Sequence, residues 1–311
     1  MIPYARLKPG PGFQARRALF YYGQRMATAP VIRRALSFLI AAAVRVRQGG
    51  PVTWPRDETC KTVLADLRKE GLAMLPPLVP PVEIRRIADY FRGNMVAAPN
   101  GARLPVEQIP AGAAAADYSL ETVLACPGLL TLVNAPRVLR IAADYLGCKP
   151  TISSIGVRWT FPFSREATRF QSFHRDVDDW RFLKLFIYLS DVDAGSGPHS
   201  FVRRSHDTAF GLTMRAYTQL EIETRFGGHK IAIVTGPMGT TFMADTLGVH
   251  CGGRPTTGPR LMLQVQYSLL PIFAFRYDPI ESEAMVDAYC NRLLLRRRAQ
   301  ARARAQRSRP F

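Results

Sequence analysis

The second half of this 311-residue chain consists largely of short apolar segments that glycine and proline separate from one another. Segments of this length match β-strands, and Gly/Pro turns between them favour an antiparallel sandwich or barrel over a parallel sheet. We expect this sheet core to span about residues 151–275. The expected strands cover residues 153–163, 182–190, 200–203, 230–234, 239–243 and 261–269.

Helical periodicity prevails in the first half of the chain. The expected helices cover residues 14–27, 31–47, 58–70, 81–91, 118–133 and 136–146, and two later ones cover 214–225 and 281–295. Residues 95–116 are rich in Pro, Ala and Gly and are expected to form a long loop, the candidate substrate lid. The fold class is therefore mainly β with flanking helices (α+β).

The formal net charge of +18 is concentrated at the two ends of the chain. Residues 1–56 contain Arg and Lys but no acid, and residues 292–311 contain eight Arg and no acid. Between the ends, acidic and basic side chains nearly balance. We expect three parts: a basic N-terminal helical extension (1–56), a main domain (57–278), and a C-terminal helix with a basic disordered tail (279–311).

The basic ends leave more than one role open. The helix expected at 31–47 has apolar residues at helical spacing and arginines at both ends. It either lies in the interface of an anionic membrane, with arginine stems reaching the phosphates, or packs on the main domain with its arginines solvated. Its longest apolar run, 36–44, is far shorter than the about 20 residues that span a bilayer. A nucleic-acid partner is not expected, because few aromatic residues lie among the arginines of the tail.

The five cysteines indicate a reducing compartment. They are odd in number, scattered, and form no Cys-x-x-Cys pair, so neither a disulfide framework nor a zinc site is expected. We therefore expect a cytoplasmic protein that contacts membranes, if at all, from their surface. Cys251 follows His250 directly and is expected to be a buried bystander thiol.

His174 and Asp176 are two residues apart, so on extended chain both side chains leave the same face. A second imidazole, His250, follows 76 residues after the first. Two His and one carboxylate bind one face of an octahedral ion and leave the opposite face open, as in non-haem Fe(II) oxygenases. The sequence therefore predicts that His174, Asp176 and His250 bind Fe(II) and form the catalytic centre.

Arg260 begins the last strong strand of the series and shares a face with Gln264 and Gln266, while Leu261 and Leu263 share the other. A guanidinium on a polar inner face suits the distal carboxylate of a dicarboxylate such as 2-oxoglutarate. Arg260 is therefore the predicted co-substrate residue, and Arg254, in a tight turn, is its competitor. The second donor to the co-substrate is left open; Thr241 and Tyr188 are candidates.

The order of these motifs resembles the phytanoyl-CoA dioxygenase family over roughly residues 60–275. The likeness runs through His174-Arg-Asp176, the strand at 182–191, the segment Gly195-Ser-Gly-Pro-His-Ser-Phe-Val-Arg-Arg-Ser-His206, then His250 and Arg260. The resemblance implies a double-stranded β-helix (jelly-roll, cupin-like) and an Fe(II)/2-oxoglutarate-dependent dioxygenase. Such an enzyme uses O2, releases succinate and CO2, and hydroxylates its substrate. Because related halogenases lack the carboxylate, Asp176 favours hydroxylation.

Other polar residues around these motifs are assigned simpler roles. His199 and His206 are expected to be structural, and Asp178 and Asp179 to face solvent or start a helix. Lys184 points off the apolar face of its strand and reaches either the co-substrate or the surface. The helix at 214–225 would form a second wall of the substrate mouth.

The leading interpretation is a dioxygenase that hydroxylates an unidentified small-molecule or lipid-like substrate. One alternative is a non-catalytic jelly roll that binds a metal or ligand without turnover. Another is a basic interaction protein that docks on a membrane or on nucleic acid through charge alone. Nothing in the sequence sets the substrate or the oligomeric state.

Overall fold

The computed structural model describes residues 3–27, 29–48, 52–98, 101–162, 171–208 and 215–297. Its centre is a sheet of eight strands, in which every neighbouring pair is antiparallel. In sheet order the strands are β1 (Leu72–Leu75), β9 (Thr241–Ala244), β6 (Phe182–Tyr188), β11 (Arg260–Ser268), β5 (Thr151–Thr160), β4 (Ala115–Asp117), β2 (Val96–Ala97) and β3 (Arg103–Leu104).

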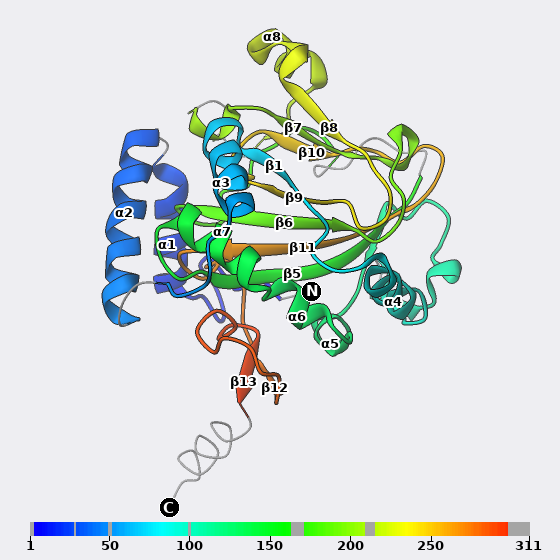
Figure 1. Cartoon of the computed structure of the whole chain (residues 1–311), viewed down its shortest axis with the longest axis horizontal. Helices are drawn as coiled ribbons and strands as arrows, with labels where there is room; N and C mark the ends of the chain where they lie inside the picture. Colours follow the sequence, from blue (N-terminus) through cyan, green and yellow to red (C-terminus); the bar gives the residue numbers. More distant parts are fainter. Residues whose placement is uncertain are drawn as a thin grey trace, which may run out of the picture.

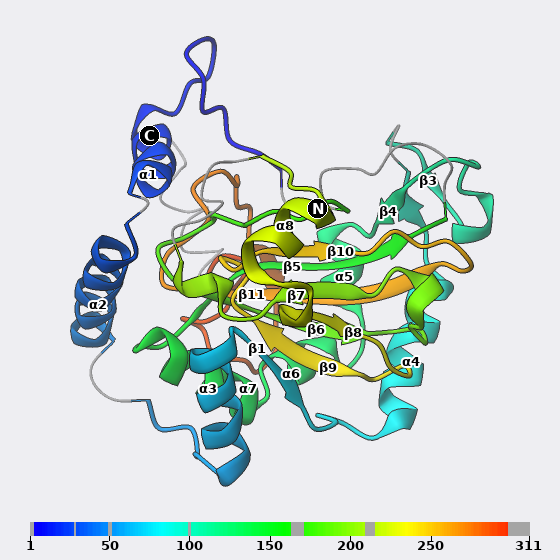
Figure 2. The ribbon, with the colours of Figure 1, turned by 90° about the horizontal axis from the view of Figure 1, so that it is seen from above.

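A smaller antiparallel sheet packs over the large one. It consists of β10 (His250–Gly252), β7 (His199–Val202) and β8 (Ile231–Val234). Figure 1 shows the small sheet above the large one, and Figure 2 looks onto it from above. The two layers confirm the predicted double-stranded β-helix with flanking helices. In these two sheets β2, β3, β4 and β10 were not predicted, because two or three residues are too few for an alternation to register.

Strand alternation gives the large sheet two apolar faces. In β6, Leu183 and Leu185 pack in one core cluster with residues of the helices, whereas Phe186 and Tyr188 belong to a second cluster with residues of the small sheet. Side chains on successive strand residues leave opposite faces, so both faces of the strand are buried. The predicted metal ligands and Arg260 lie beside this second cluster, between the sheets.

Helices cover the other face of the large sheet. They are α3 (Glu58–Glu70), α4 (Pro81–Arg92), α5 (Leu120–Ala125), α6 (Leu129–Val133) and α7 (Pro136–Leu146), and Figure 1 shows α5 and α6 below the sheet. α3 begins where the Asp57 carboxylate accepts the backbone N–H of Cys60, at 2.8 Å. α7 ends at Gly147, which adopts the left-handed conformation that glycine tolerates.

Two helices at one edge of the molecule precede this body, α1 (Ala15–Met26) and α2 (Pro30–Arg47). Both match the predicted helices closely. α2 buries Ser37 and Ala41, and its Arg33 guanidinium donates to the backbone oxygen of Asp179 at 2.6 Å. None of the helices in the described part of the chain has the length and hydropathy that crossing a membrane requires.

Three local predictions need correction or completion. The helix predicted at 281–295 is wrong: β12 (Ile280–Ser282) and β13 (Leu295–Arg297) pair in parallel, with turns between them. There the Asp287 carboxylate accepts the N–H groups of Tyr289 and Cys290, which competes with helical hydrogen bonds. The loop predicted at 95–116 contains the short strands β2, β3 and β4, and its role as a lid stays a prediction.

The helix near 214–225 is shorter than predicted. α8 (Gln219–Phe226) begins at a capping box formed by Thr218 and Glu221. Residues 209–214 and the predicted disordered tail at 298–311 lie outside the described residues. The predicted domain boundaries also stay predictions.

Candidate metal centre and co-substrate pocket

The structure brings His174, Asp176 and His250 together. One ligand atom of each lies within 4.8 Å of the others. The Nε2 of His174 is 3.8 Å from the Oδ1 of Asp176, and the Nε2 of His250 is 3.4 Å from its Oδ2. Two segments far apart in the sequence thus present three converging ligand atoms.

Backbone hydrogen bonds hold the three residues in register. His174 and His250 form an antiparallel bridge, in which each backbone N–H donates to the other's carbonyl at 2.9 Å. The N–H of Asp176 donates to the carbonyl of Thr246, also at 2.9 Å. The extended segment of His174 therefore pairs with the chain that leads into β10, which explains why the two-residue spacing places both ligands on one side.

Both imidazoles present the same nitrogen to this centre. The Nδ1 atoms of His174 and His250 lie 2.9 Å from the carbonyls of Ser172 and Gly248, respectively. A carbonyl can only accept, so each Nδ1 carries the proton and each Nε2 keeps its lone pair. This is the arrangement in which a second hydrogen bond fixes the ring of a metal-binding histidine.

The protonation states at the centre suit a divalent cation. Burial, followed by the neighbouring His250, lowers the pKa of His174 to about 4, so the ring is neutral. Burial acts to raise the pKa of Asp176, but the charges of Lys184 and His250 outweigh it and hold the pKa well below its usual range. Imidazole nitrogens and one carboxylate are the donor set that Fe(II) sites of this type use.

The role of Lys184 at this centre was not predicted from the sequence. Its Nζ donates to the Oδ2 of Asp176 at 2.6 Å and lies 3.8 Å from the Oδ2 of Asp178. In place of the predicted alternatives, co-substrate or surface, Lys184 forms a largely buried ion pair. Each carboxylate oxygen has two lone pairs, so the ion pair with Lys184 leaves Asp176 able to bind a metal as well.

Arg260 lies between the two sheets, as its strand parity predicts. It shares its face of β11 with Met262, which packs in the cluster between the sheets. The residue is 3 % exposed, and its guanidinium donates to the carbonyl of Gly197. Its competitor Arg254 is exposed. A buried guanidinium at the inner face is the better anchor for a carboxylate, because no water competes with it.

His199, which was predicted to be structural, lies beside this centre. It is 2 % exposed, and its ring stacks on that of His250 with centroids 5.5 Å apart. Its Nε2 has no hydrogen-bond partner among the described residues, and the Nε of Arg260 has none either. No sequence signal distinguished His199, since a four-residue strand gives too little alternation to show which way it points.

The two candidates for the second co-substrate donor are committed elsewhere. The hydroxyl of Thr241 donates to the carbonyl of Gly239 at 2.9 Å, and that of Tyr188 donates to the carbonyl of Val234 at 2.7 Å. Tyr188 also accepts the backbone N–H of His199 at 3.0 Å. Neither hydroxyl proton is available to a ligand in this arrangement.

Asp179 is buried, which corrects its predicted exposure. Its carboxylate accepts the backbone N–H groups of Trp180 and Leu270 and a weaker contact from the Gln24 amide of α1. Burial raises its pKa to about 8. Asp178 is partly exposed and starts no helix. Asp179 thus ties α1 to the body rather than facing solvent.

The remaining predictions for single residues concern His206 and Cys251. The Nε2 of His206 lies 3.4 Å from the carbonyl of Arg68, consistent with a structural contact. Cys251 is buried, and burial raises the pKa of its thiol to about 12, so it is protonated and unreactive.

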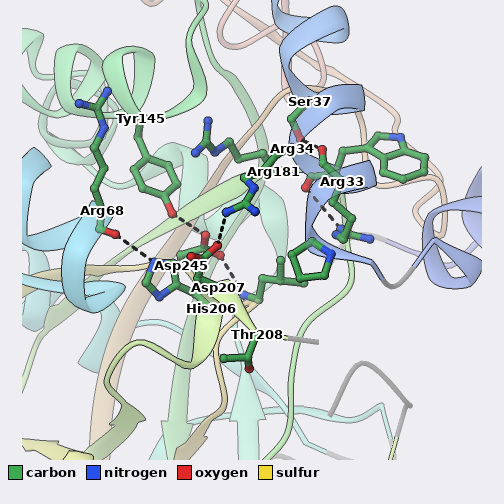
Figure 3. A pocket seen from close by; sticks show the side chains of 13 residues that line it. Arg33, Arg34, Ser37, Arg68, Tyr145, Arg181, His206, Asp207, Thr208 and Asp245 are labelled. Atoms are coloured by element: carbon green, nitrogen blue, oxygen red, sulfur yellow. Dashed lines mark hydrogen bonds and ion pairs between the residues drawn. The ribbon is translucent and has the colours of Figure 1, made fainter. Parts of the chain in front are cut away.

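A separate cavity of about 260 Å³ lies between α2 and the body (Figure 3). None of the three candidate metal ligands lines it, nor does Arg260. Figure 3 shows the ion pair between Arg34 and Asp207, at 3.0 Å, on its wall. Arg175, between two candidate metal ligands, donates to Leu247 and Thr208 of the cavity wall. The cavity therefore borders the outer side of the segment that holds the metal ligands.

Solved structures share this fold. The structure of EctD from S. alaskensis with bound Fe aligns with a TM-score of 0.52 and 16% identity over 78% of this chain and 90% of that one. HygX from Streptomyces hygroscopicus, with nickel, 2-oxoglutarate and hygromycin B bound, aligns with a TM-score of 0.50 and 15% identity over 74% and 93%. A second EctD structure holds 2-oxoglutarate and 5-hydroxyectoine and aligns with a TM-score of 0.50 and 19% identity over 78% and 90%.

No family model and no curated protein matches the sequence. Membership of the phytanoyl-CoA dioxygenase family therefore stays a prediction, and these similarities establish the fold.

Proposed function

We propose that this protein is an Fe(II)- and 2-oxoglutarate-dependent dioxygenase that hydroxylates a small-molecule or lipid-like substrate and releases succinate and CO2. The observation that carries the proposal is the convergence of two imidazoles and one carboxylate within 4.8 Å, between two sheets of a jelly roll. The EctD and HygX structures hold iron, nickel and 2-oxoglutarate, which supports the same cofactors here.

The residues of the chain fit this cofactor set. His174, Asp176 and His250 would hold the iron through their converging ligand atoms. Arg260 would bind the distal carboxylate of 2-oxoglutarate with the planar fork of its guanidinium. Iron, 2-oxoglutarate and O2 together supply the oxidation of a C–H bond to an alcohol.

The protein contributes orientation and exclusion of water. Lys184 keeps Asp176 ionised and in place, and the carbonyls of Ser172 and Gly248 fix the two imidazoles. Phe186 and Phe242 of the large sheet pack on the ring of His199 beside the centre. A dry, prearranged site of this kind strengthens charge interactions and protects a reactive centre from solvent.

We place this activity in the cytoplasm. All five cysteines are free and buried, which suits a reducing compartment.

Turnover of 2-oxoglutarate tests the proposal and separates it from a non-catalytic jelly roll. The full chain, loaded anaerobically with Fe(II), is mixed with 2-oxoglutarate, O2 and extracts of small molecules, and succinate is measured. We expect succinate that depends on iron and rises when an extract contains the substrate. His250→Ala should form none. Iron binding without any succinate would favour the binding-only alternative.

A further inference from the structure

Large apolar side chains are exposed on α1 and α2 beyond what a solvated helix needs. On α2, Phe38, Leu39 and Val46 are 66, 62 and 82 % exposed, and on α1 Leu19 and Met26 are 73 and 83 % exposed. Single exposed apolar residues are common on soluble proteins, whereas a contiguous group marks an interaction surface. Both helices lie at the same edge of the molecule in the two views (Figures 1 and 2).

The exposed residues of α2 form one face, opposite to the face that packs on the body. Val31, Phe38 and Val46 follow each other at intervals of seven and eight residues, about two helical turns each. The buried residues of α2 fall on a different line, at intervals of four, four and three: Arg33, Ser37, Ala41 and Val44. α2 therefore has two distinct faces, and the apolar outer face has no partner within the described chain.

The surroundings of this outer face are basic. Arg45 and Arg47 are exposed on α2, beside the apolar residues, whereas the exposed Arg34 pairs with Asp207 of the body. The first carboxylate of the sequence is Asp57, so neither helix contains an acid. A helix with an exposed apolar face and arginines at its borders is typical of segments that lie in a membrane interface.

We infer that the outer face of α1 and α2 docks this protein on an anionic lipid surface, with the apolar side chains in the acyl boundary and the arginines on lipid phosphates. This goes beyond the proposed function, because it needs no metal and no turnover. The basic charge of this face favours an anionic lipid surface over a second copy of the chain as its partner. A two-fold dimer would place the same arginines against each other, with no acid in either helix to compensate.

The test measures sedimentation of the full chain with vesicles of phosphatidylcholine alone and of phosphatidylcholine mixed with phosphatidylglycerol. The test variant is Phe38→Asp combined with Leu39→Asp, because both side chains are exposed and contribute nothing to the buried face. The matched control is Leu220→Asp, a 73 % exposed leucine on α8, well away from α1 and α2 (Figure 1). Thermal unfolding checks that each variant is folded.

We expect the wild type and Leu220→Asp to bind the anionic vesicles, and the double variant to bind them at least roughly tenfold more weakly. Binding should also fall as salt rises, because exposed charges are screened over about 8 Å at physiological ionic strength. Equal binding of all three proteins, or no preference for anionic vesicles, would overturn the inference. So would a dimer that dissociates in the double variant, since it would assign the face to a second copy.

A second observation, the buried and unpartnered nitrogen of His199, leads to an inference that rests on the proposed function. A buried polar atom without a partner is rare, and it calls for a ligand that the protein atoms do not supply. Here two such atoms, the Nε2 of His199 and the Nε of Arg260, belong to residues close in space. Arg260 donates to the carbonyl of Gly197, two residues before His199. The ring of His199 stacks on that of His250.

The geometry points to His199 as the second donor to the co-substrate, with its Nε2–H donating to a carboxylate oxygen of bound 2-oxoglutarate. His199 contacts the ring of His250, a candidate iron ligand, and lies near Arg260. It therefore borders the space that a molecule bound to both the iron and Arg260 would occupy. The hydroxyls of Thr241 and Tyr188 are committed to backbone carbonyls and leave this role open.

Anaerobic titration of 2-oxoglutarate into the Fe(II)-loaded full chain, followed by its charge-transfer absorbance, tests this role. His199→Leu should weaken 2-oxoglutarate binding roughly tenfold while iron binding is unchanged, and His199→Gln, which keeps an N–H donor, should recover part of it. Thr241→Val is the control and should bind as the wild type does.

The outcomes distinguish the role of His199 from the proposed function. Wild-type affinity in His199→Leu, alongside a clear wild-type signal, overturns the role of His199 and leaves the proposed function standing. A purely structural role would lower the thermal stability of His199→Leu without a specific loss of 2-oxoglutarate affinity, and would overturn it too. A wild type that gives no signal with iron and 2-oxoglutarate overturns the proposed function itself.

Discussion

The space between the two sheets and the outer edge formed by α1 and α2 use charge in opposite ways. Between the sheets, charged groups are largely shielded from solvent and have specific partners, as Asp176 has in Lys184 at 2.6 Å. At the edge, arginines such as Arg45 and Arg47 are exposed and surround an apolar face. The first arrangement selects one ion and one small molecule, and the second suits an extended surface. A change between the sheets should therefore abolish a function, whereas a change at the edge should only reduce one.

The largest effect is expected for the candidate metal ligands. His174→Ala removes one of three converging ligand atoms, so stable iron binding and all succinate formation should be lost. Iron content after anaerobic loading and desalting measures this. The matched control is His229→Ala, because His229 is exposed in the short 3-10 helix Gly228–Lys230 and is not one of the three converging residues. A variant that keeps both iron and turnover would remove His174 from the centre.

The next effect concerns the partner of Asp176. Lys184→Met leaves a largely buried carboxylate without its cation, and breaking such a pair costs about 3 kcal/mol of unfolding free energy. Added Fe(II) should restore part of this loss, because the ion supplies the missing positive charge. Urea unfolding with and without the metal measures both. An apoprotein as stable as the wild type would show that the pair contributes little.

The ion pair also predicts a pH dependence. The folded-state pKa of Asp176 is lowered, so its stabilisation is fully present above the ordinary aspartate pKa of about 4 and is lost as the pH falls further. Lys184→Met should therefore lose less stability than the wild type on acidification. Equal acid sensitivity of the two proteins would contradict this assignment.

A smaller effect is expected at Arg260, where only the co-substrate is involved. Arg260→Ala should weaken 2-oxoglutarate binding roughly hundredfold, equivalent to about 2.7 kcal/mol, and leave iron binding intact. Arg260→Lys should recover it only in part, because an ammonium lacks the bidentate fork. The anaerobic absorbance titration measures all three proteins, with Arg254→Ala as the control. A loss confined to Arg254→Ala would transfer the role to that residue.

The smallest and most graded effect is expected at the edge. Arg45→Gln and Arg47→Gln should each weaken binding to anionic vesicles about fivefold, since one cation near such a surface contributes about 1 kcal/mol. The double variant should show the product of the two effects and a weaker dependence on salt. An all-or-none loss from one substitution would indicate a specific pocket instead of a diffuse surface, and would weaken the contrast with the interior.

The sequence predicted those parts of the site that depend on local spacing. His174 and Asp176 are two residues apart on extended chain, and Arg260 shares its strand face with Met262, so their directions followed from strand geometry. What Lys184 and His199 contact could not be predicted in the same way. Parity placed Lys184 off the apolar face, but its partner Asp176 comes from another segment that only the folded chain brings near.

The same distinction explains the errors in the fold. Long, regularly patterned segments such as α2 and β11 were predicted within a few residues. The segment 281–295 has helical spacing, yet side-chain hydrogen bonds from Asp287 and the burial of Cys290 and Leu294 impose turns. Asp179 looked like a solvent-facing residue beside Asp178, because its burial depends on α1 and on the chain at Leu270.

A crystal structure of the full chain, grown anaerobically with Fe(II) and 2-oxoglutarate and with the iron located by anomalous scattering, would show the occupied site directly. We expect one iron bound by the Nε2 atoms of His174 and His250 and a carboxylate oxygen of Asp176. The distal carboxylate of 2-oxoglutarate should lie on Arg260, within hydrogen-bond distance of His199. Iron at another site, or a co-substrate carboxylate held away from Arg260, would contradict this expectation.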